Sequence, residues 1–301
     1  MSRLHTASPD LVPDPERQDL ATTLTLTQLD DSLFQGRSRP GRPTRTFGGE
    51  VLGQAMMAAG ATVDADRAIH SAYAYFVLPG DSSRPVTYRV ARVRDGGSFT
   101  TRSVEAIQRD RTIFTAMLSF ARPGAEGALQ HQALSSPSPD PETLPDPAEE
   151  FADEPVNQAW YDWLIRAQPI DIRFPEPISR VLSSRGEPGR PRQRVWMRAH
   201  RPFPAGPTAH NAILAYLSDL FLLSAALGPH DRELGDGTLQ FATLDHGIWF
   251  HAPLDPGDWF LYDMDGFWAG QDRALCRGYL FDRSGTLCAS TLQEGLLRRT
   301  S

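Results

Sequence analysis

Residues 239–251, LQFATLDHGIWFH, have the composition of a buried β-strand that is interrupted by polar side chains. Phe241, Ile248 and Trp249 are typical of strands, whereas Thr243 and Asp245 lie between them. Burial of polar groups at this density is costly unless each group finds a hydrogen-bond partner. The stretch therefore predicts a strand that belongs to a polar cluster inside the fold.

Two other polar residues stand alone in apolar segments. Asp219 lies in AYLSDLFLLSAAL (215–227), and Gln293 lies in CASTLQEGLLR (288–298). Each needs a buried partner for the same reason as the polar residues of the first stretch. We therefore expect Asp219, Thr243 and Gln293 to meet in space, with the rest of the chain holding them together.

Composition limits the class of protein. With 301 residues, of which 40% are hydrophobic, the chain can form one large or two ordinary domains. A net charge of −7, without a long basic run, argues against a nucleic-acid binder.

The two cysteines form no CxxC or Cys/His pattern, so we expect buried thiols and no metal site. We find no signal peptide and no apolar run long enough to span a bilayer, and we expect a cytoplasmic protein.

The chain divides into four parts by pattern. Residues 1–21 form a polar, Pro-rich tail that we expect to be disordered. Residues 22–122 contain FGGEVLGQAMMAAGATV (47–63), which has helical spacing, followed by strand-like runs. Residues 123–190 are Pro-rich and predict either a plain linker or a cover over a sheet. Residues 191–301 contain a second apolar helix, expected to break near Ser218–Asp219, and further strands.

The second and fourth parts share one plan. Each has a helix, a long apolar strand, a Pro-Gly-Asp turn (79–81 and 256–258) and three more strands. This duplication predicts an α+β fold with two antiparallel sheets, each wrapped on a central helix. In the expected register Phe120 of the first copy corresponds to Gln293 of the second. The extra polar groups indicate that the second copy carries the chemistry and the first became a support.

The motifs together resemble the acyl-CoA thioesterase II family, whose members have a double hotdog fold. The resemblance rests on FGGEVLGQA (47–55), HSAYAYFVLPGDSSRPV (70–86), AYLSDL (215–220), ATLDHGIWFH (242–251) and ASTLQEGLLR (289–298). It implies hydrolysis of acyl-CoA to free acid and CoA, with Asp219, Thr243 and Gln293 as catalytic residues. It also implies that no cofactor is needed, because CoA is part of the substrate, and that double hotdogs associate into homo-oligomers, as dimers or tetramers.

The residue types fit activation of a water molecule. No G-x-S-x-G motif occurs and neither cysteine has a catalytic context, which disfavours a covalent nucleophile. Asp219 is the expected general base, and Thr243 and Gln293 are expected to fix the water. A helix restart at the break near Asp219 would free backbone N–H groups that polarise the thioester carbonyl.

Several other residues are candidates for substrate binding. Gly49, next to Gly48, would let a helix start approach a ligand closely. His70 is the strongest of three histidines that could act as bases; the others are His246 and His251. Asp245 and His246 could instead orient the site residues. Arg94 and Arg102 are candidates for the CoA phosphates.

Two alternatives stay open at the level of sequence. An enoyl-CoA hydratase on the same fold would need a histidine close after Asp219, and none follows it. A non-catalytic acyl-CoA binding protein would have no use for a water-orienting set such as Asp219, Thr243 and Gln293. Release of free thiol from a CoA ester separates an enzyme from a binding protein.

Overall fold

The structure is a computed structural model that describes residues 19–38, 45–122, 124, 131–133, 135–162, 168–187, 189–230 and 239–299. Most of the expected N-terminal tail lies outside these residues. The first described element, α1 (Leu20–Leu24), begins at the end of that tail. Its N-cap Asp19 accepts a hydrogen bond from the backbone N–H of Thr22.

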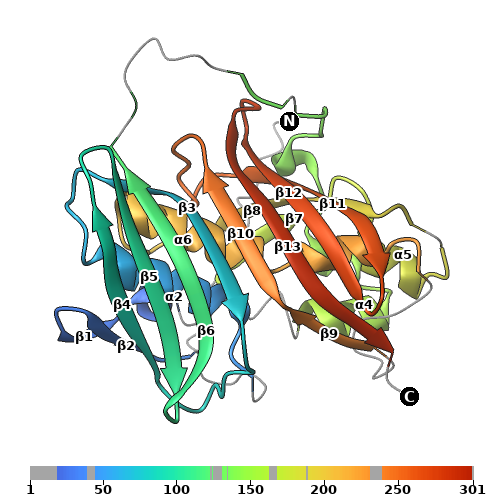
Figure 1. The fold of residues 1–301 in the computed structure, drawn as a ribbon. Coiled ribbons are helices and arrows are strands. Elements are labelled where there is room, and N and C mark those ends of the chain that lie inside the picture. Colours follow the sequence, from blue (N-terminus) through green and yellow to red (C-terminus); the bar gives the residue numbers. More distant parts are fainter. Residues whose placement is uncertain are drawn as a thin grey trace.

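The strands pair into one antiparallel sheet in the order β1-β2-β4-β5-β6-β3-β10-β13-β12-β11-β8-β7, with β9 also paired to β13. The order is mirrored about the β3–β10 pair, so the two halves have the same plan (Figure 1). The N-terminal half holds β1 (Thr27–Asp30), β2 (Leu33–Gly36), β3 (Ala68–Phe76), β4 (Val86–Asp95), β5 (Phe99–Gln108) and β6 (Arg111–Ala121). The C-terminal half holds β7 (Ile170–Arg173), β8 (Arg192–Ala199), β9 (Leu239–Thr243), β10 (Asp245–Phe250), β11 (Phe260–Gly270), β12 (Arg273–Asp282) and β13 (Leu287–Arg299).

The expectation of two separate sheets is wrong, because β3 and β10 join the halves. Their ladder runs from Asp245 opposite Tyr75 to Trp249 opposite Ser71. Each of these strands would otherwise leave a row of unpaired N–H and C=O groups at the edge of its half. Ile248 on this junction is fully buried. The pairing therefore satisfies both edges and produces one continuous sheet.

Two helices lie side by side against one face of the sheet, behind it in Figure 1. They are α2 (Gly48–Gly60) and α6 (Pro207–Ser218), as the apolar periodicity predicts. Gly53 lets them approach, since a Cβ there would lie 3.1 Å from the Ala212 carbonyl oxygen. The predicted break is confirmed: α6 ends at Ser218, and a 3₁₀ helix, η3 (Leu223–Leu227), follows after a turn.

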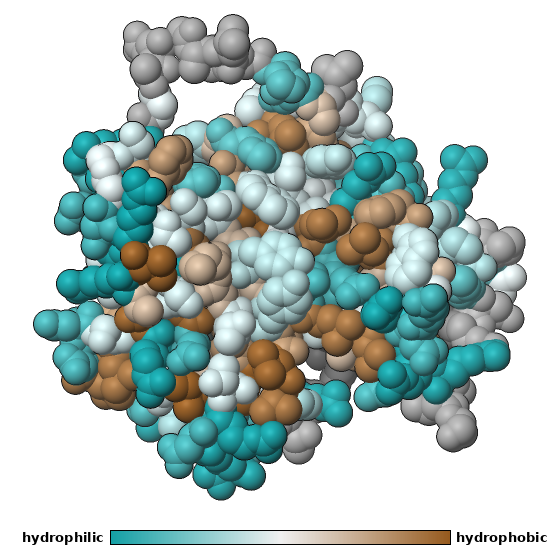
Figure 2. Space-filling view, in the orientation of Figure 1, coloured by the Kyte–Doolittle hydropathy of each residue, from teal (hydrophilic) through white to brown (hydrophobic). Residues whose placement is uncertain are grey.

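The opposite face of the sheet is partly open to solvent. Side chains alternate between buried and more exposed along β5, as expected for a sheet with one covered face. Figure 2 shows apolar side chains scattered among polar ones on this outer face. The exposed large hydrophobic residues include Tyr75, Met117 and Trp249.

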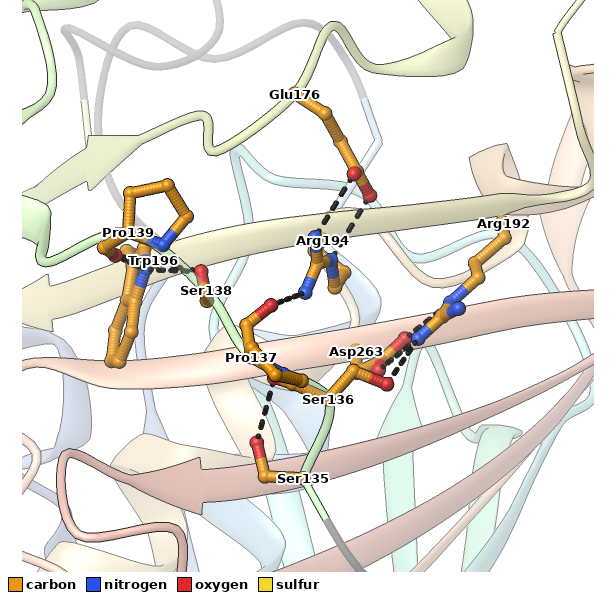
Figure 3. Close-up of polar contacts among 10 residues, drawn as sticks. All are labelled: Ser135, Ser136, Pro137, Ser138, Pro139, Glu176, Arg192, Arg194, Trp196 and Asp263. Atoms are coloured by element: carbon orange, nitrogen blue, oxygen red, sulfur yellow. Dashed lines mark hydrogen bonds and ion pairs between the residues drawn. The ribbon is translucent and has the colours of Figure 1, made fainter.

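The Pro-rich part of the chain is a cover rather than a plain linker. Residues 135–139 cross the outer face of β8 and β11 (Figure 3). Arg194 donates to Glu176 at 3.0 Å and to the Pro137 carbonyl oxygen at 2.8 Å, and Trp196 Nε1 donates to Ser138 Oγ at 3.0 Å. Residues 141–184 add η1 (Pro141–Thr143), α3 (Pro147–Glu150), α4 (Pro155–Trp160), the edge strand β7, and α5 (Ser179–Ser184). Proline content alone does not reveal these contacts.

One described segment, Pro207–Leu227, is long and apolar enough to cross a membrane by length and composition. This corrects the expectation that no run in the sequence reaches that length. Most of the segment is buried inside the structure, as in the core helix of a soluble protein. The test by length and composition is therefore weak evidence for a membrane span here.

Candidate active site

Asp219, Thr243 and Gln293 meet, as the sequence predicts. Thr243 Oγ1 donates to Asp219 Oδ1 at 2.9 Å, and Gln293 Nε2 donates to the same oxygen at 2.7 Å. Gln293 Nε2 also donates to Thr243 Oγ1 at 2.7 Å. The pairing of β9 with β13 sets this geometry, because Thr243 lies opposite Gly295, two residues from Gln293 on the same face of the strand.

A third donor reaches Asp219 from the other half of the protein. The backbone N–H of Gly49, in the first turn of α2, donates to Asp219 Oδ2 at 2.8 Å. The first N–H groups of a helix have no partner within the helix, and its N-terminus carries partial positive charge. The expectation that a helix restarts at Asp219 is therefore wrong. α6 ends there, and the N–H group near the carboxylate comes from the start of α2.

Both glycines at the start of α2 are required by close packing. A Cβ at Gly48 would lie 2.6 Å from Asp219 Oδ2, and a Cβ at Gly49 would lie 2.4 Å from the Tyr216 carbonyl oxygen. No ordinary Cβ contact is that short. Only glycine therefore lets the start of α2 reach the Asp219 carboxylate.

The surroundings of Asp219 raise its pKa to about 6. Burial is the largest cause, and the hydrogen bonds from Thr243, Gln293 and Gly49 partly offset it. Asp219 nevertheless keeps part of its surface open to solvent. The carboxylate is therefore ionised above about pH 6 and within reach of water, as a general base must be.

Asp245 and His246 lie beside this cluster and are buried. Asp245 Oδ1 accepts from the backbone N–H of Glu294 at 2.9 Å. His246 Nε2 shares a hydrogen with Ser218 Oγ at 2.9 Å, and burial lowers the pKa of His246 to about 4. His246 is thus a neutral imidazole held inside the protein. This geometry favours an orienting role over action as a solvent-exposed base.

The other two histidines lie apart from the cluster. His70 Nε2 pairs with Ser119 Oγ at 2.8 Å, and burial lowers its pKa. It stands six residues before Phe76, about 20 Å along the strand from the end of β3 that contacts Leu244. His251 Nε2 pairs with Ser290 Oγ at 2.8 Å. The structure therefore does not bring His70 to the Asp219 cluster.

The two candidate arginines differ in their surroundings. The Arg102 side chain is 2% exposed and donates to Thr62, Asp95 and the Arg94 carbonyl oxygen. These contacts favour a structural role over phosphate binding. Arg94 itself has an exposed side chain near the end of β4. A surface hollow of about 490 Å³ borders Arg102, and it does not include Asp219, Thr243 or Gln293.

Metal and thiol chemistry find no support in the described part of the chain. No group of three or more His, Cys, Asp or Glu side chains there could hold a metal ion. Cys276 and Cys288 are free and buried, and burial raises their pKa values to about 12 and about 11. Both thiols are thus protonated at neutral pH, which makes them poor nucleophiles.

Some residues that complete the site are not predicted from the sequence. Ser218 holds His246, and Tyr262 donates to the Ser218 carbonyl oxygen at 3.0 Å. Gly48 was noted only as a partner of Gly49, although its missing side chain leaves room for the Asp219 carboxylate. The signal for Gly48 was present, since two glycines at a helix start are unusual without a packing reason.

Comparisons with known proteins agree over most of the chain. A family model described as acyl-CoA thioesterase matches residues 172–296, and one described as acyl-CoA thioesterase N-terminal domain matches residues 38–121. Acyl-coenzyme A thioesterase 8 from Homo sapiens is 36% identical over 93% of this chain and 88% of its own length.

Solved structures give the same result. Acyl-CoA thioesterase II TesB2 from Mycobacterium marinum is 35% identical, with a TM-score of 0.74 over 94% of this chain and 99% of that one. A conserved protein with a hot dog fold from Alicyclobacillus acidocaldarius is 18% identical, with a TM-score of 0.74 over 94% of this chain and 98% of that one. The second likeness supports the hotdog fold alone.

Proposed function

Because this chain belongs to the acyl-CoA thioesterase family, it is a thioester hydrolase that acts on acyl-CoA, and we propose that Asp219, Thr243 and Gln293 activate the attacking water. The observation that carries the proposal is the meeting of three donors at one partly buried carboxylate. Thr243, Gln293 and the N–H of Gly49 all point to Asp219. A pKa of about 6 leaves this carboxylate ionised at neutral pH and more basic than an ordinary aspartate.

The reaction needs one proton acceptor. Asp219 takes a proton from water as the water oxygen attacks the thioester carbonyl carbon, which gives a tetrahedral intermediate. When the C–S bond breaks, the protonated Asp219 returns the proton to the CoA sulfur. The products are the free acid and CoA thiol, and the carboxylate is regenerated without a cofactor.

Thr243 and Gln293 have the polar groups needed to place the water. Thr243 Oγ1 donates to Asp219 and accepts from Gln293, which leaves it one further lone pair. Asp219 Oδ2 accepts only from Gly49 among the hydrogen bonds of the described residues. We therefore place the water between Thr243 Oγ1 and Asp219 Oδ2, where its direction of attack is fixed.

The start of α2 supplies electrostatic stabilisation. The N–H of Gly48 lies in the first helical turn and is directed out of the helix end. We propose that this N–H, together with the helix dipole, stabilises the negative oxygen of the tetrahedral intermediate. Each half of the chain thus contributes to one site: the base comes from the C-terminal half and the helix end from the N-terminal half.

The geometry also bears on the two alternatives. A hydratase needs a histidine beside the aspartate, and the imidazole of His246 instead bonds Ser218 and is fully buried. A pure binding protein gains nothing from a buried carboxylate, because burial of this charge costs free energy. Both considerations favour hydrolysis.

We propose further that each half is one hotdog unit, with residues 22–122 and 191–301 as the two units. The support is the mirrored strand order, with one central helix in each half. Association of such double hotdogs into homo-oligomers stays a prediction.

Release of free thiol from short, medium and long acyl-CoAs by wild type and Asp219→Asn tests the proposal. We expect Asp219→Asn to lose about 10²–10⁴-fold in kcat, the usual contribution of a general base, while its circular dichroism is unchanged. Asp110→Asn, at an exposed turn, is the matched control and keeps full activity. Wild-type turnover by folded Asp219→Asn would overturn the assignment, and no release from any ester by wild type would overturn the substrate class.

A further inference from the structure

His246 and Gln293 lie on the neighbouring strands β10 and β13, at the end of the ladder that joins them. The β10–β13 ladder pairs Gly247 with Leu292 and continues through Phe250 opposite Ala289. His246 and Gln293 are the next residues beyond the last pair of this ladder, before the register shifts by one residue to Thr243 opposite Gly295. Both side chains are fully buried.

The hydrogen-bonding groups of the two side chains match. Gln293 Nε2 is used by Asp219 and Thr243, so Gln293 Oε1 points away from them. Gln293 Oε1 and His246 Nδ1 are both buried atoms without a hydrogen-bond partner among the described residues. The Gln293 side chain also favours the protonated form of His246, as a neighbouring acceptor does.

The Gln293 carbonyl oxygen decides which nitrogen of His246 carries the hydrogen, because it can only accept, whereas the Ser218 hydroxyl can donate or accept. Burial keeps the ring neutral, so one nitrogen is a donor and the other an acceptor. With the hydrogen on Nε2, the bare Nδ1 would face the carbonyl oxygen of Gln293, and two acceptors repel. With the hydrogen on Nδ1, it donates to Gln293 Oε1, and Nε2 accepts from Ser218 Oγ. The second arrangement gives both Nδ1 and Gln293 Oε1 a partner, and it uses the Ser218 hydrogen that otherwise goes to the Ala215 carbonyl oxygen at 2.9 Å.

We propose that His246, as the neutral Nδ1–H tautomer, is a positioning residue that fixes the Gln293 amide with its nitrogen toward Asp219 and Thr243. The inference rests on the proposed water activation by these three residues. An amide free to flip would turn its oxygen toward Asp219 Oδ1, where two acceptors repel. His246 touches none of the reacting atoms and acts only through Gln293.

Loss of the His246 contact should shift the acidic limb of the pH profile of kcat/KM. The Gln293 hydrogen bond lowers the pKa of Asp219 against the effect of burial. Loss of that bond therefore moves the apparent pKa of kcat/KM upward. The titratable groups packed nearby are Asp245, Tyr73 on β3, Tyr262 on β11 and Cys276 on β12. Burial raises the pKa values of Tyr73, Tyr262 and Cys276, so these three stay neutral below about pH 8.

Three substitutions separate positioning from packing. In His246→Asn the amide nitrogen takes the place of Nδ1, in His246→Gln it takes the place of Nε2, and His246→Ala removes both. We expect His246→Ala and His246→Gln to lose about 10–100-fold in kcat, as on loss of a hydrogen-bond partner that orients a metal ligand in a metalloenzyme. KM should change little, and the acidic limb should move to higher pH. His246→Asn should keep kcat, and the apparent pKa of the acidic limb of kcat/KM, close to the wild-type values.

Two results would overturn the proposal. One is an unchanged kcat and acidic limb in folded His246→Ala; the other is rescue by His246→Gln and not by His246→Asn. If the variants fail to fold, ¹⁵N NMR of the wild-type imidazole decides, because a hydrogen on Nε2 contradicts the tautomer. Asp219→Asn is measured in parallel. Its inactivity upholds water activation whatever the His246 variants do, so the two proposals fail separately.

Discussion

At the scale of single residues, every polar side chain that interrupts an apolar segment here has found a partner. Asp219 collects three donors, and Gln293 uses its amide nitrogen twice. Such groups were visible in the sequence because an unpaired polar atom is costly in a core. Which of these groups bond to one another is visible only in the structure, since 74 residues separate Asp219 from Gln293.

The raised pKa of Asp219 predicts that the free energy of unfolding depends on pH. A pKa raised from 3.8 to about 6 in the folded state means that folding favours the protonated form. The stabilisation is complete below about pH 4 and is lost as the pH rises to about 6. Relative to a normal aspartate, the ionised form costs the folded state about 3 kcal/mol above that pH. Asp219→Asn removes this titration.

Thermal unfolding of wild type and Asp219→Asn at pH 4.5, 6 and 8 measures the effect. We expect the variant to gain Tm relative to wild type between pH 4.5 and 6, and the difference to level off by pH 8. Asp110→Asn, on the exposed turn, should show no such trend. A difference in Tm between variant and wild type that stays constant over this range would contradict a raised pKa.

At the scale of elements, the end of one helix faces the start of the other. α6 ends at Ser218, directly before Asp219, and α2 begins at Gly48, whose missing side chain leaves room for the carboxylate. The N-terminus of α2 therefore places partial positive charge where the base and the developing oxyanion lie. Close packing of the two helices fixes the distance between the start of α2 and the Asp219 carboxylate.

Gly49→Ala tests the close approach of α2. Its Cβ would lie 2.4 Å from the Tyr216 carbonyl oxygen, so the first turn of α2 must shift away from Asp219. We expect a loss of about 10²–10³-fold in kcat, as for removal of one oxyanion-hole donor, measured by thiol release. Gly97→Ala is the matched control, because a Cβ there meets nothing within 4 Å. Equal kcat values for the two variants would rule out a need for glycine at position 49.

The sequence predicted elements better than their assembly. Apolar periodicity located both helices, the break at Ser218 and most strands, because burial of one face imposes that pattern. Asp219 and Gln293 each stand alone among apolar residues and need a buried partner, and this need predicted that they meet. It could not show that Gly49 reaches Asp219 across 170 residues, since periodicity carries no information about which helix end faces which strand.

At the scale of the whole molecule, one continuous sheet and one shared helix layer tie the halves together. Ile248, Ala72 and Ala74 are buried where β10 meets β3. Separation of the halves would expose these residues and leave two rows of backbone groups unpaired. The active site would also lose either its base or its helix end. We therefore expect the halves to unfold together in a single transition.

The tryptophans make this cooperativity measurable. All six lie between residues 160 and 268, so their fluorescence reports mainly on the C-terminal part of the chain, and Trp249 also reports on the β3–β10 junction, where it lies opposite Ser71. Leu118→Ala opens a cavity in the N-terminal half, where Leu118 is fully buried, and should cost about 2–5 kcal/mol. If the halves unfold together, the transition followed by tryptophan fluorescence falls by about 5–10 °C. Met117→Ala, at the neighbouring exposed position, should leave it in place. A tryptophan transition unmoved by Leu118→Ala, with a separate earlier loss of ellipticity, would mean that the halves are independent and that the β3–β10 ladder contributes little to their union.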